Sequence, residues 1–538
     1  MFDLLITNAR VIDGTGAPWF RAHVGVRDGR IADVFCGAPA DAETVIDAGD
    51  AFLTPGFIDV HTHDDIAFLR RGGRGEKIVQ GVTTIVTGNC SFSAYPFVGD
   101  DDAPLREHIG SLLGSIRPGE VFCDYAGYRA ALQGGGIGPN LVSLVGHGPI
   151  RLAVLGNQSR PATPEERERM ERLLDVQLEQ GAAGLSLGLI YTPSSWADDA
   201  ELRGLADVVA KRGRILAAHI RNYDAGIDES IEEFLALLKH SGCKGLLSHL
   251  QVCGSENWGR MPELLDRLEE ARREGIDVSC DMYPYTAGSS TILQLLPPSA
   301  QEGGIDAIVD RLSEPESREI IRQAVVEDIT ADLNWRSKAT QIGWDNIRIG
   351  GVEAESHKRY EGRFIAEAAE SESRDPFDLA ADLIVCDCGR SNMIMFQQDE
   401  GDLRKVLGHR LYMSGSDSIP RESGKPHPRG AGTFPRLLGE YALKDNLQSL
   451  EEAVRHMTSL PAQRFSLWDR GVVRPGAVAD LVLFGATVID GATYDEPTLP
   501  PKGIGTVIVG GKLVVVDGTP QSEMPGKVLD AGKRMSLA

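Results

Sequence analysis

Short apolar runs alternate with amphipathic stretches through the middle of the chain. The runs have the length of β-strands, and the stretches between them, such as PEERERMERLLDVQLEQG, carry apolar residues at helical spacing. Eight such runs separated by helices predict the α/β fold of a (β/α)8 TIM barrel over residues 56–464. The predicted barrel strands are residues 56–63, 83–90, 140–148, 183–191, 215–220, 244–250, 277–284 and 411–418.

One interval in this alternation is unusually long. Between the runs at 277–284 and 411–418 the chain is too long to form a single loop of a barrel. We therefore expect an inserted subdomain before the last barrel strand, at about residues 290–345 and close to the active face.

The two ends of the chain have a different pattern from the middle. Both contain short runs of alternating apolar residues, broken by turn residues such as Asp-Gly and Gly-Lys. Two separate β-caps would each be too small to be stable alone. The pattern therefore predicts one small antiparallel β-domain, composed of residues 1–55 and 465–538 together.

Composition and charge narrow the class of protein. The formal net charge of −23 argues against a nucleic-acid partner, because the field of the chain would repel phosphates. No run of about 18 apolar residues predicts a membrane span, and the N-terminal stretch lacks the pattern of a signal peptide. The eight cysteines have no disulfide-framework spacing, which predicts a reducing cytoplasm. Homo-oligomerisation stays open.

Side chains that can bind a metal ion occur at the ends of the predicted strands. Alone, a strand-end histidine or cysteine is more often structural, and an aspartate in SGSDS is more often a helix N-cap. In a barrel, however, the C-terminal ends of the strands converge on one face, and His-X-His places both rings on one side of a strand. The coincidence predicts a metal site formed by His61, His63, Cys90, His219, His249 and Asp417.

The donor types indicate which metal and which chemistry to expect. Imidazole, thiolate and carboxylate together suit zinc, and a catalytic zinc site keeps one position open for water. Zinc lowers the pKa of such a water to about 7. Asp417 is then placed to accept the proton of the water and later to give it to a leaving amine. We expect neither a serine nucleophile nor a phosphate-binding loop.

At these residues the chain resembles the amidohydrolase superfamily, and within it the N-acyl-D-amino-acid deacylases (D-aminoacylases). The matching segments span most of the chain, and GNC followed by the later histidines and GSDS is the most specific part. The resemblance implies a zinc-dependent enzyme that cleaves the amide bond of N-acyl-D-amino acids to a carboxylate and a D-amino acid. The segments include PGFIDVHTHDD, GVTTIVTGNCSFS, AAHIRN, SHLQVCGSENWGR, DMYPYTAG, SGSDS and GKPHPRGAGTFPRLLGEY.

The resemblance also assigns roles to the metal ligands. Cys90 corresponds to the bridging ligand of the family, and with His219 and His249 it would hold one zinc ion tightly. A second, weaker zinc site would use His61, His63 and Asp417. Asp417 would act as the general base and then as the general acid.

Candidates for substrate binding follow from the same segments. Tyr283 resembles the tyrosine that polarises the scissile carbonyl, although an aromatic core residue is the alternative. Arg221 would meet a substrate carboxylate, or else form a surface salt bridge. Tyr191 and Arg429, in IYTP and HPRG, are weaker candidates.

One departure from the family affects the substrate. After the second histidine the family has His-Lys, and its lysine contacts the substrate near the carboxylate, whereas this chain has Leu250-Gln251. Loss of that cation leaves an alternative open: the same scaffold acting on a different amide, carbamate, ester or lactone. A binding protein with a dead site is a further alternative, but it would be expected to have lost ligands that this chain retains.

Overall fold

The computed structural model describes residues 1–71, 75–329 and 335–531. At its centre nine parallel strands occupy the eight positions of a closed barrel, because β8 and β9 share one position on either side of Leu144. The barrel strands are β6 (Phe57–Asp59), β7 (Val82–Thr87), β8 (Asn140–Ser143), β9 (Val145–Gly146), β10 (Gly184–Gly188), β11 (Ile215–His219), β12 (Lys244–Leu247), β13 (Val278–Met282) and β17 (Tyr412–Ser414).

The barrel closes between its first and last strands. The amide of Val60 donates to the Ser414 carbonyl at 3.2 Å, and Thr62 forms a parallel bridge with Ser418. At the shared position, the Ala183 amide donates to the Ser143 carbonyl at 2.8 Å. The predicted (β/α)8 barrel is therefore confirmed, and each observed strand lies inside or within one residue of its predicted run.

Helices surround the barrel and bury one face each. In α6 (Pro164–Gln180), Thr163 and Glu166 form a capping box, and the buried side chains include Met170 and Leu174. The other helices on the barrel are α1 (Ala67–Arg71), α2 (Gly75–Ile78), α3 (Ala103–Leu113), α4 (Tyr125–Gly135), α5 (His147–Leu155), α7 (Asp199–Lys211), α8 (Ile227–Ser241), α9 (Met261–Arg273), α15 (Glu400–Leu407), α16 (Arg429–Arg436), α17 (Leu450–Met457) and α18 (Ser459–Arg464).

Both ends of the chain meet in one nine-stranded sheet. Strand β18 (Leu481–Ile489) pairs antiparallel with β5 (Phe52–Pro55), which joins the C-terminal strands to the N-terminal ones. The sheet is mostly antiparallel, but β1 pairs in parallel with β4 and β5. The remaining strands are β1 (Phe2–Val11), β2 (Phe20–Arg27), β3 (Arg30–Phe35), β4 (Ala42–Asp47), β19 (Lys502–Val509), β20 (Lys512–Val516) and β21 (Thr519–Pro520).

The last described residues leave this sheet and return to the barrel. Pro525 and Val528 form parallel bridges with Ile137 and Leu141, and the Leu529 amide donates to the Leu141 carbonyl at 2.8 Å. Ala531 belongs to the same buried cluster as barrel residues such as Val142. We keep the division at 1–55 and 465–538 as a proposal, adjusted so that residues 525–531 are counted with the barrel.

Most of the segment between β13 and β17, from Ala287 to Phe396, forms a separate layer with its own core. Strands β14 (Ala287–Thr291), β16 (Asn392–Phe396) and β15 (Ile347–Gly351) pair antiparallel, and their buried side chains pack on the helices of the layer. This layer continues to Phe396, beyond the predicted limit of about residue 345. Its helices are α10 (Ile305–Ser313), α11 (Pro315–Glu327), α12 (Lys338–Ile342), α13 (Ile365–Glu370) and α14 (Pro376–Asp387).

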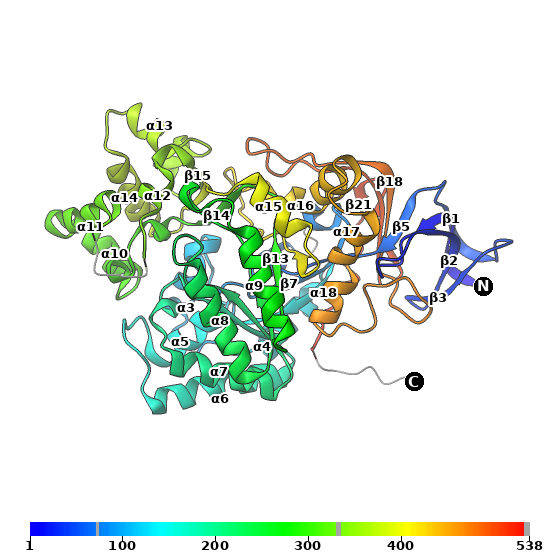
Figure 1. The fold of residues 1–538 in the computed structure, drawn as a ribbon, viewed down its shortest axis with the longest axis horizontal. Helices are drawn as coiled ribbons and strands as arrows, with labels where there is room; N and C mark the ends of the chain where they lie inside the picture. The colour runs from blue at the N-terminus through cyan, green and yellow to red at the C-terminus, as the bar shows by residue number, and fades with distance from the viewer. Residues whose placement is uncertain (72–74, 330–334, 532–538) are drawn as a thin grey trace.

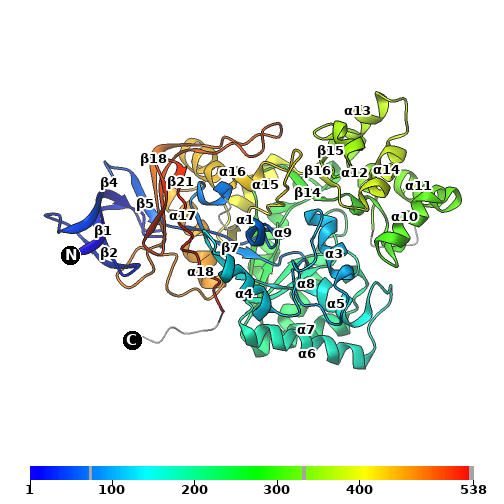
Figure 2. The same ribbon diagram turned by 180° about the vertical axis from the view of Figure 1, so that it is seen from behind.

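The three parts are arranged in a row. The nine-stranded sheet lies at one end of the molecule, the inserted layer at the other, and the barrel between them (Figures 1 and 2). Within the described ranges, no helix is both long enough and apolar enough to span a membrane.

Candidate metal centre

The predicted metal ligands converge at the C-terminal rim of the barrel. They form three overlapping groups, and within each group the potential ligand atoms lie within 4.8 Å of one another. Every residue in these groups is buried. The groups are His61 with His63 and Cys90, Cys90 with His219 and His249, and His61 with His249 and Asp417.

The two histidines after β6 are held by hydrogen bonds to both neighbouring strands. The Thr62 amide donates to the Val86 carbonyl at 3.0 Å, and the His63 amide donates to the Ser418 carbonyl at 2.9 Å. Because the backbone stays extended across Thr62, His61 and His63 share a face of the strand, and that face looks into the barrel.

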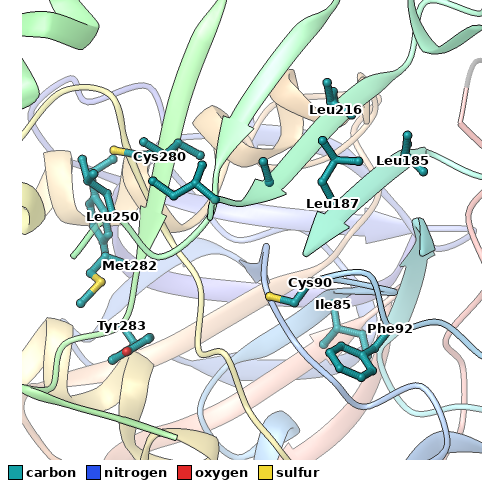
Figure 3. Packing of buried hydrophobic residues seen from close by; sticks show 14 of the residues in the cluster. Ile85, Cys90, Phe92, Leu185, Leu187, Leu216, Leu250, Cys280, Met282 and Tyr283 are labelled. Carbon is teal, nitrogen blue, oxygen red and sulfur yellow. The ribbon is translucent and has the colours of Figure 1, made fainter. Parts of the chain in front are cut away.

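Cys90 is placed by a tight turn after β7. Gly88 has φ +78°, and a Cβ there would lie 2.1 Å from the Leu144 carbonyl oxygen, so only glycine fits. Cys90 itself has φ +52°. Its Sγ lies 3.1 Å from His61 Nε2 and 3.5 Å from His249 Nε2. Figure 3 shows Cys90 with Ile85, Phe92 and Leu187 of the apolar cluster around it.

Asp417 faces the histidines with one carboxylate oxygen and an arginine with the other. Its Oδ1 lies 3.1 Å from His63 Nε2, and its Oδ2 lies 2.9 Å from Arg429 Nη2. Burial alone would raise the pKa of Asp417, but Arg429 and His61 hold it well below its usual range. The carboxylate is therefore ionised and able to accept a proton.

Asp281 is a functional candidate that the sequence reasoning missed. This buried carboxylate on β13 lies 3.2 Å from His61 Nδ1 and accepts the His249 amide at 2.8 Å. Burial would lower the pKa of His61, yet Cys90, Asp281 and Asp417 raise it well above its usual value. Asp281 lies within the quoted segment DMYPYTAG, where a carboxylate in an otherwise apolar strand was the available signal.

The donor set fits zinc. Burial raises the pKa of the Cys90 thiol to about 11 and lowers the pKa of His249 to about 4. Burial likewise lowers the pKa of His219 well below its usual value. His219 and His249 are thus neutral and ready to donate a lone pair, while binding of a cation would release the Cys90 thiol proton. Thiolate and imidazole are the ligands zinc prefers.

A cavity opens beside these ligands and extends under the inserted layer. Tyr191, Gln251 and Tyr283 line it together with His219, His249 and Asp417. The Tyr283 hydroxyl donates to Gln251 Oε1 at 3.1 Å, and Gln398 Nε2 donates to both Tyr283 and Gln251. Burial raises the pKa of Tyr283, so its hydroxyl stays protonated and remains a donor. Gln398, which follows β16, had no sequence signal.

The other predicted substrate-binding residues differ in position. Tyr191 lines the cavity, packs edge-on against His219 and shares a 3.0 Å hydrogen bond with Ser290. Arg429 is fully buried behind Asp417, donates to the Ser289 carbonyl and lies over the Tyr283 ring.

The structure does not bring Arg221 into the cavity. Its Nε donates to Glu233 at 2.9 Å, and its two terminal nitrogens donate to the carbonyls of Ser195 and Ala197 at 2.8 Å. Through these bonds the guanidinium links the loop at residues 195–197 to α8. We therefore do not retain Arg221 as a receptor for a substrate carboxylate.

One motif in the sequence matches a serine-hydrolase pattern without forming that site. Residues 184–188 read GLSLG, but Ser186 lies inside β10, fully buried, rather than on a strand-to-helix turn. Its hydroxyl donates to the Gly88 carbonyl and accepts from the Ser91 amide at 3.1 Å. These contacts support the GNC turn and agree with the expectation of no serine nucleophile.

Comparison with known proteins agrees with this geometry. Residues 400–515 match the model of the Amidohydrolase family. N-acyl-D-glutamate deacylase from Alcaligenes xylosoxydans xylosoxydans is 37% identical, over 98% of this chain and 96% of that protein. D-aminoacylase from the same organism is 35% identical, over 98% of this chain and 97% of that protein.

A solved structure is similar over the same length. The crystal structure of N-acyl-D-glutamate deacylase from Bordetella bronchiseptica, complexed with zinc and a phosphonate inhibitor that mimics the tetrahedral intermediate, has a TM-score of 0.84. It is 35% identical and covers 98% of this chain and 100% of that chain. The resemblance found in the sequence is thus confirmed, and the chain belongs to the N-acyl-D-amino-acid deacylase (D-aminoacylase) family of the amidohydrolase superfamily.

Proposed function

We propose that the protein hydrolyses the amide bond of N-acyl-D-amino acids to a carboxylate and a D-amino acid. The observation that carries this proposal is the convergence of Cys90, His219 and His249 beside Asp417, at the floor of a cavity lined by hydrogen-bonding side chains. The similarity to deacylases over nearly the whole chain supports the same reaction.

Zinc is the metal that this site is proposed to hold. Cys90, His219 and His249 would bind one ion tightly. His61 and His63, whose Nε2 atoms lie 3.5 and 3.1 Å from Asp417 Oδ1, would contribute with Asp417 to a second, weaker site. When bound, zinc polarises the amide carbonyl and lowers the pKa of a water molecule.

The residues of the chain have separable roles in this proposal. Asp417 accepts a proton from the attacking water and returns it to the leaving nitrogen, so that the amine departs neutral. Tyr283 donates a hydrogen bond to the carbonyl oxygen as negative charge develops on it. Arg429 holds Asp417 from behind, and Tyr191 and Gln251 contact the substrate from the wall of the cavity.

The cellular setting is also a proposal. All eight cysteines lie within the described residues and are unpaired, which supports a reducing, cytoplasmic location. The substrate is a small molecule, and assembly into a homo-oligomer is left to direct measurement.

A panel of substrates tests the proposed reaction. The wild-type protein with zinc should release free amino acid from N-acetyl-D-amino acids and not from their L-isomers. Tyr283→Phe should lower kcat by about 100- to 1000-fold, because one oxyanion donor is lost. Turnover of esters, lactones or other amides without turnover of any N-acetyl-D-amino acid would favour the alternative raised by Gln251.

A further inference from the structure

A lysine from the inserted layer reaches the cavity beside the metal centre. Lys338 begins α12, which belongs to the inserted layer (Figure 1). It is 7% exposed. Among the described residues that line the cavity, it is the only lysine or arginine.

The contacts of Lys338 leave its ammonium group only partly used. Its Nζ donates to Gln341 Oε1 at 3.1 Å and lies 3.6 Å from Asp224 Oδ2. Gln341 in turn donates to Asp224 at 2.6 Å. Asp224 is the acidic partner of this buried lysine, but it does not line the cavity. An ammonium has three N–H donors, and one of them is used in the hydrogen bond to Gln341.

The rest of the cavity wall makes this cation significant. Gln251, Tyr283, Ser289 and Gln397 are neutral, and the carboxylate of Asp417 would repel an anion. Arg429 is fully buried, does not line the cavity and is paired with Asp417. Apart from a bound metal ion, the cation that an anionic group would meet on the described wall of this low-dielectric space is Lys338.

We infer that Lys338 binds a carboxylate of the substrate and is a specificity-determining residue of this enzyme. The inference rests on the proposed function, in which the substrate is an N-acyl amino acid that carries at least one carboxylate. Lys338, from the inserted layer, supplies a positive charge for the substrate carboxylate. Gln251, on the barrel side of the cavity, is neutral and does not. The competing interpretation is that Lys338 only braces the layer against Asp224.

Binding of non-hydrolysable probes separates these interpretations. The first probe is 2-isobutyl-4-oxopentanoic acid, which replaces the amide nitrogen of N-acetyl-leucine with CH2. The second probe is its primary amide, and the third is an amide of the same type whose only carboxylate is on the side chain. Affinities are measured by titration calorimetry on the zinc-loaded protein.

Lys338→Gln should weaken binding of a carboxylate probe by at least about tenfold and leave the uncharged amide unchanged. Loss with the first probe assigns the α-carboxylate, and loss with the third assigns the side-chain carboxylate. Lys338→Arg should retain most of the affinity, because the charge is kept. Lys239→Gln, at a lysine 68% exposed on α8, is the matched control and should change nothing.

An equal change for all three probes, or no change for any, would overturn the inference. A brace alone would lower the unfolding temperature of Lys338→Gln and affect charged and uncharged probes alike. Failure of the proposed function would give a different result. The wild-type protein would then not turn over N-acetyl-D-amino acids, whatever affinities the probes show.

Discussion

At the scale of single residues, the metal centre is made of side chains on an unusual backbone. Cys90, His249 and Asp417 have φ values of +52°, +34° and +49°, in a region that residues other than glycine rarely adopt. The surrounding hydrogen bonds, such as the 2.7 Å bond from the Asp417 amide to the His61 carbonyl, hold these conformations. Such backbone strain is typical of sites where a side chain must point in one direction.

Replacement of Asp417 by asparagine removes the proposed proton acceptor with little change in shape. Asp417→Asn should reduce kcat for N-acetyl-D-amino acids by at least about 100-fold, since general base catalysis contributes that much or more. Zinc bound through Cys90, His219 and His249 should be retained, which metal analysis of the purified variant checks. A variant with normal zinc content and kcat within about tenfold of wild type would refute the role.

Asp281 should act through the histidines rather than on the substrate. Asp281→Asn removes the negative charge next to His61 Nδ1, and loss of such an outer partner lowers metal affinity by about 10- to 100-fold. Competition with a chromogenic chelator measures this change. Asp277→Asn is the control, because Asp277 contacts Arg464 and Arg272 instead. Equal zinc affinity in the two variants would show that Asp281 has no such role.

At the scale of elements, the strands were predictable and the contacts between loops were not. Barrel strands such as LSLG and VSCDM are buried on both faces, so they stand out as apolar runs between polar helices. The end of the inserted layer was missed because α14, β16 and α15 repeat the helix–strand–helix alternation of the barrel. Periodicity alone does not distinguish the two.

The candidate site divides in the same way. His61, Cys90 and Asp417 were identifiable because each lies at or near the end of a predicted strand, and the strand ends must converge. Lys338 and Gln398 were not identifiable. Lys338 lines the cavity from the inserted layer, and Gln398, just after that layer, donates to Gln251 and Tyr283. Only the packing of the layer on the barrel brings both residues to these positions. Arg221 follows a strand as well, but its guanidinium pairs with Glu233 on the next helix and does not reach the cavity.

A buried lysine ties together the loops that carry His61 and Asp417. Lys77 Nζ on α2 donates to Asp59 at 2.8 Å and to Ser416 Oγ at 2.7 Å. Both charged groups are fully buried, so removal of the lysine leaves the Asp59 carboxylate without its counter-ion, although the Ser416 amide still donates to it. Lys77→Met should lower the free energy of unfolding by about 3–5 kcal/mol, measured by denaturant titration.

An exposed lysine provides the control for this prediction. Lys444 pairs with Glu440 along one helix and is 67% exposed, so Lys444→Met should change stability by less than about 0.5 kcal/mol. Similar small effects in both variants would show that the Lys77 network contributes little to the fold.

At the scale of the whole molecule, two C-terminal segments pair with parts of the structure formed by earlier residues. Strand β18 completes the sheet begun by the N-terminal strands, and residues 525–531 then pair with the β8 edge of the barrel. Residues 525–531 thereby join the sheet to the barrel, which lie next to each other in Figure 2. The inserted layer is the third part, and its contribution to the cavity lets it influence substrate choice.

The terminal segment should therefore contribute to global stability. Val528 is 7% exposed against the barrel, and Val528→Asp would bury a carboxylate with no partner. We expect a loss of more than about 2 kcal/mol, seen as a lower unfolding temperature. Met524→Asp, at a residue 43% exposed, should have almost no effect. Equal unfolding temperatures for the two variants would contradict a structural role of this segment.

The central claim is that one tightly bound zinc ion at Cys90, His219 and His249 supports hydrolysis of N-acyl-D-amino acids. Its most direct test is the rate of D-amino acid release as zinc is added to protein freed of metal by a chelator. The account predicts no activity without metal, recovery with the first equivalent, and no recovery at that equivalent in Cys90→Ala. Full activity after chelation, or full recovery in Cys90→Ala, would contradict it.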